Sequence, residues 1–188
     1  MSKSAGAIVA VIFIVLASAA SAAREGATPE DVAIAQGLLV RLGYDPGPVD
    51  GVYGARTTQA IRLFHETHEY ELPLGEIELQ TAAVVDNLIT AFVAHLMEPS
   101  KSTSSLYRAA IAGDGNAAIE LGFMYLQGRS VVADPMMAYF WWTVAESTGT
   151  SRIINMKDWL KASGRISNHE IACARRLVVQ LNNAVHNR

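Results

Sequence analysis

The chain has 188 residues, a formal net charge of −3 and a single cysteine, and 51% of its residues are hydrophobic. This length suits one ordinary domain or two small ones. The mildly acidic charge argues against nucleic acids and anionic membrane surfaces as main partners. The lone Cys173 excludes an internal disulfide, and its apolar helical surroundings in the sequence predict a buried side chain.

Residues 1–23 have the composition of a secretory signal peptide. An early cation, Lys3, precedes an apolar run over residues 7–16, and only Ala and Ser follow. Small residues allow cleavage after residue 22 or 23. No cysteine stands at the cleavage point, so we expect no lipoprotein processing. An uncleaved anchor is the alternative, because residues 5–23 are uncharged and just long enough to span a bilayer. We therefore expect a periplasmic or secreted protein that meets the membrane only through this segment, before cleavage.

The next stretch predicts three helices around a rigid loop. A first helix over 29–42 begins with a capping threonine, a proline and two acids. The loop 42–54, LGYDPGPVDGVYG, contains four glycines and two prolines. We expect Gly43 to end the helix in a left-handed conformation, and Asp50 to accept backbone N–H groups. Helices over 55–69 and from about 76 to 97 complete this unit.

The second half of the chain predicts further helices behind a linker at 98–105. Glycines separate the helices, and alanines stand where helices would cross. This pattern is typical of a short array of helical hairpins. The predicted helices cover 103–112, 116–127, 135–148, 150–162 and 167–184.

The run VAIAQGLLVRLGYDPGPVDGVYGARTTQAIRLFHE resembles the peptidoglycan-binding-like domain of many bacterial cell-wall proteins. The resemblance covers about 30–86, and one position departs from it, because the family usually has Gln where this chain has His65. It implies a non-catalytic three-helix module that holds a partner enzyme or adaptor near murein. The best-matching positions are Gln36, Leu39, Leu42, Gly43, Tyr44, Gly47, Val49, Asp50, Gly51, Gly54, Thr57, Ala60 and Phe64.

A second run, NAAIELGFMYLQGRSVVADPMMAYFWWTVAESTG, resembles a Sel-like repeat, a relative of the tetratricopeptide repeats. Partial repeats flank it, so the resemblance covers about 106–182. Within it, the aromatic run 139–142 cannot be buried on one side of a helix, because successive residues point about 100° apart. Tyr139 and Trp142 are therefore candidates for contact with a protein partner, and the alternative is that both cover the neighbouring helix pair.

Three residues of the first unit are candidates for ligand binding: Asp50, Tyr53 and Arg56. A tyrosine ring suits a sugar face, and an arginine suits the carboxylate of a stem peptide. The alternative is that Tyr44 and Tyr53 pack the loop onto the helices.

The string His65-Glu66-Thr67-His68-Glu69 is the strongest candidate for catalysis or metal binding. Its histidines stand three residues apart, unlike the H-E-x-x-H of zinc proteases. Two histidines at this spacing could hold a metal with Glu69 or His95, but we favour a solvated helix face. We predict no catalytic residue, metal or cofactor.

These patterns lead to an all-α, exported protein of the bacterial cell envelope. A three-helix peptidoglycan-binding-like bundle over 24–97, a linker over 98–105 and a repeat domain over 106–188 follow the signal peptide. The first domain would bind peptidoglycan and the second a protein partner. One alternative is a peptidoglycan hydrolase or metal-dependent wall peptidase. Another is a purely protein-binding periplasmic regulator that has lost its wall ligand, for which His65 is the supporting feature.

Overall fold

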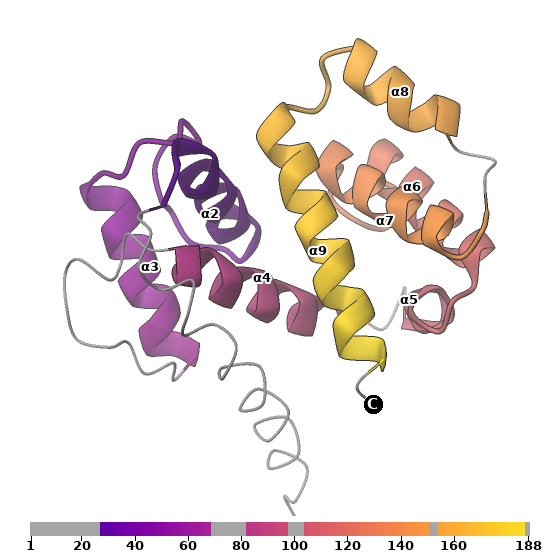
Figure 1. The fold of residues 1–188 in the computed structure, drawn as a ribbon, viewed down its shortest axis with the longest axis horizontal. Helices are drawn as coiled ribbons and strands as arrows, with labels where there is room; N and C mark the ends of the chain where they lie inside the picture. The colour runs from indigo at the N-terminus through magenta and orange to yellow at the C-terminus, as the bar shows by residue number, and fades with distance from the viewer. Residues whose placement is uncertain (1–26, 69–81, 98–103, 151–153, 187–188) are drawn as a thin grey trace, which may run out of the picture. The chain divides into compact units, whose positions relative to one another are not determined.

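The computed structural model describes residues 27–68, 82–97, 104–150 and 154–186, and this part of the chain contains eight α-helices and no β-strand (Figure 1). The predicted all-α class is confirmed. The helices are α2 (Pro29–Arg41), α3 (Ala55–His68), α4 (Ala82–Leu96), α5 (Ser104–Ile111), α6 (Gly115–Gln127), α7 (Pro135–Ser147), α8 (Ile154–Ala162) and α9 (Asn168–His186).

The helix limits lie close to those that apolar spacing, glycine and proline predict. The expected helices 29–42 and 135–148, for example, correspond to α2 and α7. The predictions that lie outside the described residues include the signal segment 1–23, the start of the third helix near 76, and residues 98–103 of the linker.

The chain divides into two compact units. Unit 1 consists of Met1–Leu39 and Tyr44–Asn87, and unit 2 consists of Val40–Gly43 and Leu88–Arg188. Two helices therefore contribute residues to both units, because α2 ends at Arg41 and α4 runs from Ala82 to Leu96. The division falls within α4, whereas the linker expected from the sequence covers 98–105.

The core of unit 1 is built from the apolar faces of α2 and α3 and the first turns of α4. A reciprocal cap starts α2: the Thr28 hydroxyl accepts the N–H of Asp31, and the Asp31 carboxylate accepts the N–H of Thr28. The aromatic ring of Phe64 lies at the centre of this core, with Tyr44 packed edge-on against it. The fully or nearly fully buried apolar side chains include Ile34, Leu38, Leu39, Ile61, Phe64, Val84 and Val85.

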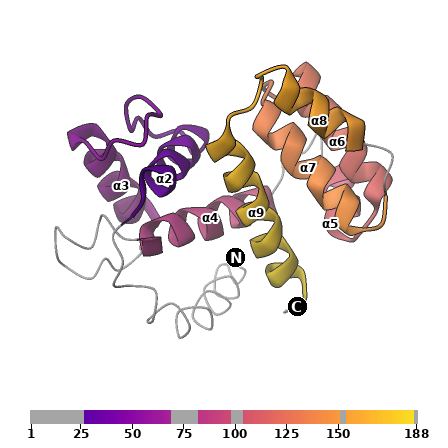
Figure 2. The same ribbon diagram turned by 45° about the horizontal axis from the view of Figure 1, so that its top comes forward.

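Helix α7 is the centre of unit 2. It contacts α6, α8 and α9, and α5 packs against α6 (Figure 2). Asp134 caps its N-terminus, and Pro135 occupies the first turn. Nine of its thirteen residues are buried, including the whole aromatic run Tyr139–Trp142. A helix surrounded by neighbours on several sides explains how four successive large side chains are all removed from water.

Candidate functional site

The loop 42–54 of unit 1 is organised by the side chain of Gln36, which projects from α2 and is 1% exposed. Its Oε1 accepts the backbone N–H groups of Asp50 at 3.1 Å and Gly51 at 3.0 Å. Its Nε2 donates toward Asp50 Oδ1, the Val52 carbonyl and Thr57 Oγ1, all within 3.2 Å. A single buried amide therefore replaces the regular hydrogen bonding that this turn lacks.

Thr57 extends this network from the first turn of α3. Its hydroxyl donates to the carbonyl of Pro46 at 3.0 Å, on the opposite arm of the loop. Thr57 is 2% exposed, so this contact is shielded from water. The two arms of the loop are thus tied to both α2 and α3.

Two glycines allow the chain to enter and leave this turn. Gly43 has a φ of 90° and ends α2, and the N–H of Tyr44 donates to the Leu39 carbonyl at 2.9 Å. The predicted left-handed end of this helix is confirmed. Gly51 has a φ of 73°, and a Cβ added there would stand 2.6 Å from the carbonyl oxygen of Pro29. Only glycine fits both the conformation and the space at this position.

The predicted role of Asp50 as an acceptor in the turn is also confirmed. Its Oδ1 accepts the N–H of Val52 at 2.9 Å. That bond and the bond from Gln36 hold the pKa of the Asp50 carboxyl below its usual value. The residue is nevertheless exposed.

Arg56 does not meet Asp50. Its Nη2 instead contacts both carboxylate oxygens of Asp45, and this interaction is the main reason that the pKa of Asp45 is lowered. Both side chains are mostly exposed, at 64% and 75%. An ion pair this exposed contributes little to stability, so it can exchange for another carboxylate at small cost.

The two tyrosines of the loop differ in their surroundings. The ring of Tyr44 packs on Phe64, and its hydroxyl lies 2.8 Å from Thr67 Oγ1, so Tyr44 fastens the loop to α3. Tyr53 is half-buried, and burial raises the pKa of its hydroxyl. Near it, Val49 and Val52 expose apolar side chains. The exposed groups of the loop and of the first turn of α3, which we call the outward face of the loop, thus include two apolar side chains, part of a phenol ring and a guanidinium.

The expectation that the His65–Glu69 string forms a solvated helix face is wrong for His65. This side chain is 2% exposed, and its ring stands edge-on to Phe64 at 5.3 Å between centroids. The buried stripe of α3 is wider than the predicted one, and it includes His65, one turn after Ile61. Glu69 lies outside the described residues, and no group of three His, Cys, Asp or Glu side chains among those described could hold a metal ion.

The two candidate partner residues of the second half lie in the core of unit 2. Tyr139 is 1% exposed and Trp142 is 0% exposed. Trp142 packs over Gly122 of α6, and its indole N–H donates to the Ile119 carbonyl at 3.3 Å. The ring of Tyr139 is covered by Lys157 of α8, whose ammonium lies 4.7 Å from the ring centroid. These side chains cover the neighbouring helices, and they leave no exposed surface for a partner.

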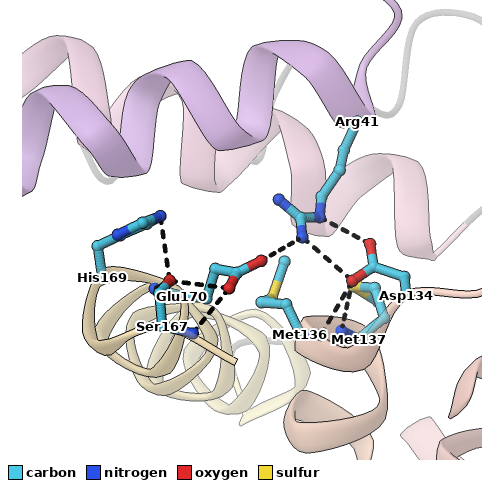
Figure 3. A network of polar contacts seen from close by, with 7 residues as sticks. All are labelled: Arg41, Asp134, Met136, Met137, Ser167, His169 and Glu170. Atoms are coloured by element: carbon cyan, nitrogen blue, oxygen red, sulfur yellow. Dashed lines mark hydrogen bonds and ion pairs between the residues drawn. The ribbon is translucent and has the colours of Figure 1, made fainter. Parts of the chain in front are cut away.

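A polar network that the sequence did not predict joins the start of α7 to the start of α9 within unit 2 (Figure 3). Arg41 donates from Nε to Asp134 Oδ2 at 2.7 Å, from Nη2 to Asp134 Oδ1 at 3.1 Å, and from Nη2 to Glu170 Oε1 at 3.3 Å. Each carboxylate also caps its own helix. Burial would lower the pKa of Arg41, but the hydrogen bond and charge of Asp134 outweigh it and raise that pKa.

Residues 28–71 match a family model described as a putative peptidoglycan binding domain. The match contains α2, α3 and the whole of loop 42–54. It supports peptidoglycan binding and a cell-wall-associated location. No curated protein and no solved structure matches the chain significantly. None of the helices in the described ranges combines the length and apolar character needed to cross a membrane.

Proposed function

We propose that this chain is a non-catalytic, exported envelope protein that binds peptidoglycan through the outward face of loop 42–54 and a protein partner through unit 2. The family match over 28–71 carries the first part of the proposal, because it covers this loop and the residues that shape it. The Sel-like resemblance of unit 2 supports the second part. The signal-peptide composition of residues 1–23 supports export.

The surface of the loop fits the chemistry of murein. The exposed side chains of Val49 and Val52 and the Tyr53 ring can pack against the C–H faces of sugar rings. The Arg56 guanidinium can leave Asp45 and pair with the carboxylate of a stem peptide. Because the Gln36 network holds the turn, little conformational freedom is lost on binding, which favours affinity.

The burial of His65 supports retention of the wall ligand. This residue is the one clear departure from the family pattern, and it lies in the core rather than on the outward face of the loop. The change therefore leaves the exposed surface intact. For this reason we favour a wall-binding protein over a regulator that has lost its ligand.

Sedimentation with purified murein sacculi at low salt tests the proposal. We expect the mature protein to sediment with the sacculi, and Arg56→Gln to reduce the retained fraction several-fold. Arg129→Gln is the matched control, since Arg129 forms a similarly exposed ion pair with Glu120 in unit 2. If the unaltered protein stays in the supernatant, direct wall binding is wrong.

Two further readouts separate the alternatives. Release of muropeptides from the same sacculi would establish a hydrolase and overturn the non-catalytic assignment. Cross-linking to a periplasmic protein without any retention on murein would favour the regulator.

A further inference from the structure

One groove of unit 2 has no role in the function proposed above. It consists of two adjoining cavities of about 260 Å³ and 300 Å³, which share Ile111, Ala112 and Val185 in their walls. It lies where α5, α7 and α9 end, and Met97, just past α4, closes one side of the smaller cavity. The volumes stand at the lower limit of ligand clefts, which suits inserted side chains better than a cofactor.

The groove has an apolar wall and a cation at its edge. Met97, Ile111 and Val185 supply apolar surface to the smaller cavity, and Arg108 borders it. Arg108 is exposed and forms no ion pair with any described residue. Arg41, Arg129 and Lys157 of unit 2 pair with carboxylates, whereas Arg175, which lies away from the groove, resembles Arg108 in forming no ion pair with a described residue.

The position of Arg108 in the last turn of α5 has a structural explanation, because a cation there complements the helix dipole. That explanation does not account for the apolar cavity beside it. Together, the two features match an apolar side chain carried next to a carboxylate. The second cavity continues the groove past Val144 and Leu181, so a segment can pass through it rather than end in it.

We propose that this groove binds an internal segment of a partner protein in which an apolar residue stands next to Asp or Glu. The apolar side chain enters the cavity beside Ile111 and Val185, and the carboxylate pairs with Arg108. The proposal rests on the assignment of a protein partner to unit 2, and it places that partner at the helix ends instead of on Tyr139 and Trp142.

A displayed library of random heptapeptides, selected on the full chain, tests this site. We expect the selected peptides to be enriched about tenfold or more in an apolar residue beside Asp or Glu, because a charge-assisted contact changes affinity by about that factor. Selection on Arg108→Glu should lose this pair and favour Lys or Arg in its place. Val185→Ser should weaken the apolar preference and keep the acidic one.

Arg175→Glu is the matched control, because Arg175 is also exposed in unit 2 and lies outside the groove. It should select the same peptides as the unaltered chain. The inference is overturned if no acidic–apolar pair is enriched, or if Arg108→Glu selects it equally well. Peptides that are insensitive to Arg108 would leave a protein-binding unit 2 but place its site elsewhere. The sacculus assay reads unit 1 separately, so failure here leaves wall binding intact.

Discussion

The side chain of Gln36 connects α2 to residues 50–52 of the loop and to Thr57 of α3 through five polar contacts, and it does so from a buried position. Removing the amide would leave backbone N–H groups of the turn without their acceptor. We expect Gln36→Leu to lower the free energy of unfolding by about 2–3 kcal/mol, the usual cost of unsatisfied buried polar groups. Urea denaturation measures this change, and the exposed Gln59→Leu should be nearly neutral.

Asp50 makes the loop sensitive to acid. The Val52 N–H, followed by the Gln36 amide, holds the pKa of Asp50 below its unfolded value of about 3.9. A carboxyl with a lowered folded pKa stabilises the fold above its unfolded pKa, and this stabilisation is lost as the pH falls through the folded value. We therefore expect Asp50→Asn to flatten the decline of stability below about pH 4.

Urea midpoints between about pH 2.5 and 6 measure the effect over the range in which carboxyls titrate. Asp158→Asn, an exposed carboxylate of unit 2, is the control. If stability declines at low pH in Asp50→Asn as steeply as in the unaltered protein, the contact with Val52 does not lower the pKa of the folded carboxyl.

At this scale, the sequence predicted residues whose role is local. Gly43 and Asp50 act on atoms within a few positions along the chain, so turn chemistry alone identifies them. Gln36 was recognised only as a matching family position, because its acceptors and donors lie 14 to 21 residues away. The prediction for His65 is wrong because the polarity of histidine favours solvent, whereas its spacing of four residues from Ile61 places it on the buried face of α3.

Among the helices, α6 and α7 show how a close approach depends on one missing side chain. A Cβ added to Gly122 would stand 2.1 Å from Trp142 Nε1. Helix propensity alone would make Gly122→Ala stabilising by about 1 kcal/mol. We expect instead a net loss of about 1–2 kcal/mol, because overpacking of a core costs more than that gain.

Thermal unfolding and the near-ultraviolet circular dichroism of the buried indoles report this change. Gly54→Ala is the control, since nothing lies within 4 Å of its added Cβ and its φ is not positive. A stabilised Gly122→Ala variant would mean that the two helices can separate at no cost.

The helix starts of α7 and α9 depend on one arginine. Arg41→Met would leave the carboxylates of Asp134 and Glu170 partly buried without their cation. We expect a loss of about 1–3 kcal/mol, as for a charged hydrogen bond. Arg56→Met, which removes a mostly exposed pair, should cost clearly less than Arg41→Met. Equal urea midpoints for the two variants would contradict this ranking.

The spacing of apolar residues predicts where helices form, but it does not predict which residues of a helix are buried. The four aromatic residues of α7 were expected to divide between core and surface, because one side of a helix cannot hold them all. In the structure α7 contacts α6, α8 and α9, so side chains that point in different directions from α7 are all buried. Arg41 pairs with residues that lie 93 and 129 positions away in the chain. Contacts over such separations leave no local pattern in the sequence.

For the molecule as a whole, Cys173 provides a reporter of the folded state of unit 2. It is buried in α9, as predicted, and burial raises the pKa of its thiol to about 12. We expect no labelling by a thiol reagent at pH 8 in the native protein and full labelling in denaturant, because the thiolate is the reactive form. Gly122→Ala should accelerate labelling under native conditions. Fast labelling of the unaltered native chain would contradict the burial of α9.

The same thiol predicts a loss of stability in alkali. An unfolded cysteine ionises near pH 8.5, whereas the folded one remains protonated until about 12. The stabilisation is therefore complete below about pH 8.5 and is lost as the pH rises toward the folded value. Cys173→Ala should remove this component, and urea midpoints between about pH 8 and 11 measure it across the range in which thiols ionise.

The Gln36 network separates the conformation of the binding loop from the chemistry of its exposed surface, two properties that are usually linked. Its conformation depends on buried side chains and on backbone groups, whereas the side chains of Val49, Val52 and Arg56 are exposed and take no part in that network. Substitutions at these outer positions can therefore accumulate without refolding the turn. A scaffold of this kind allows ligand preference to drift between lineages, or to be selected in the laboratory, while the architecture stays constant.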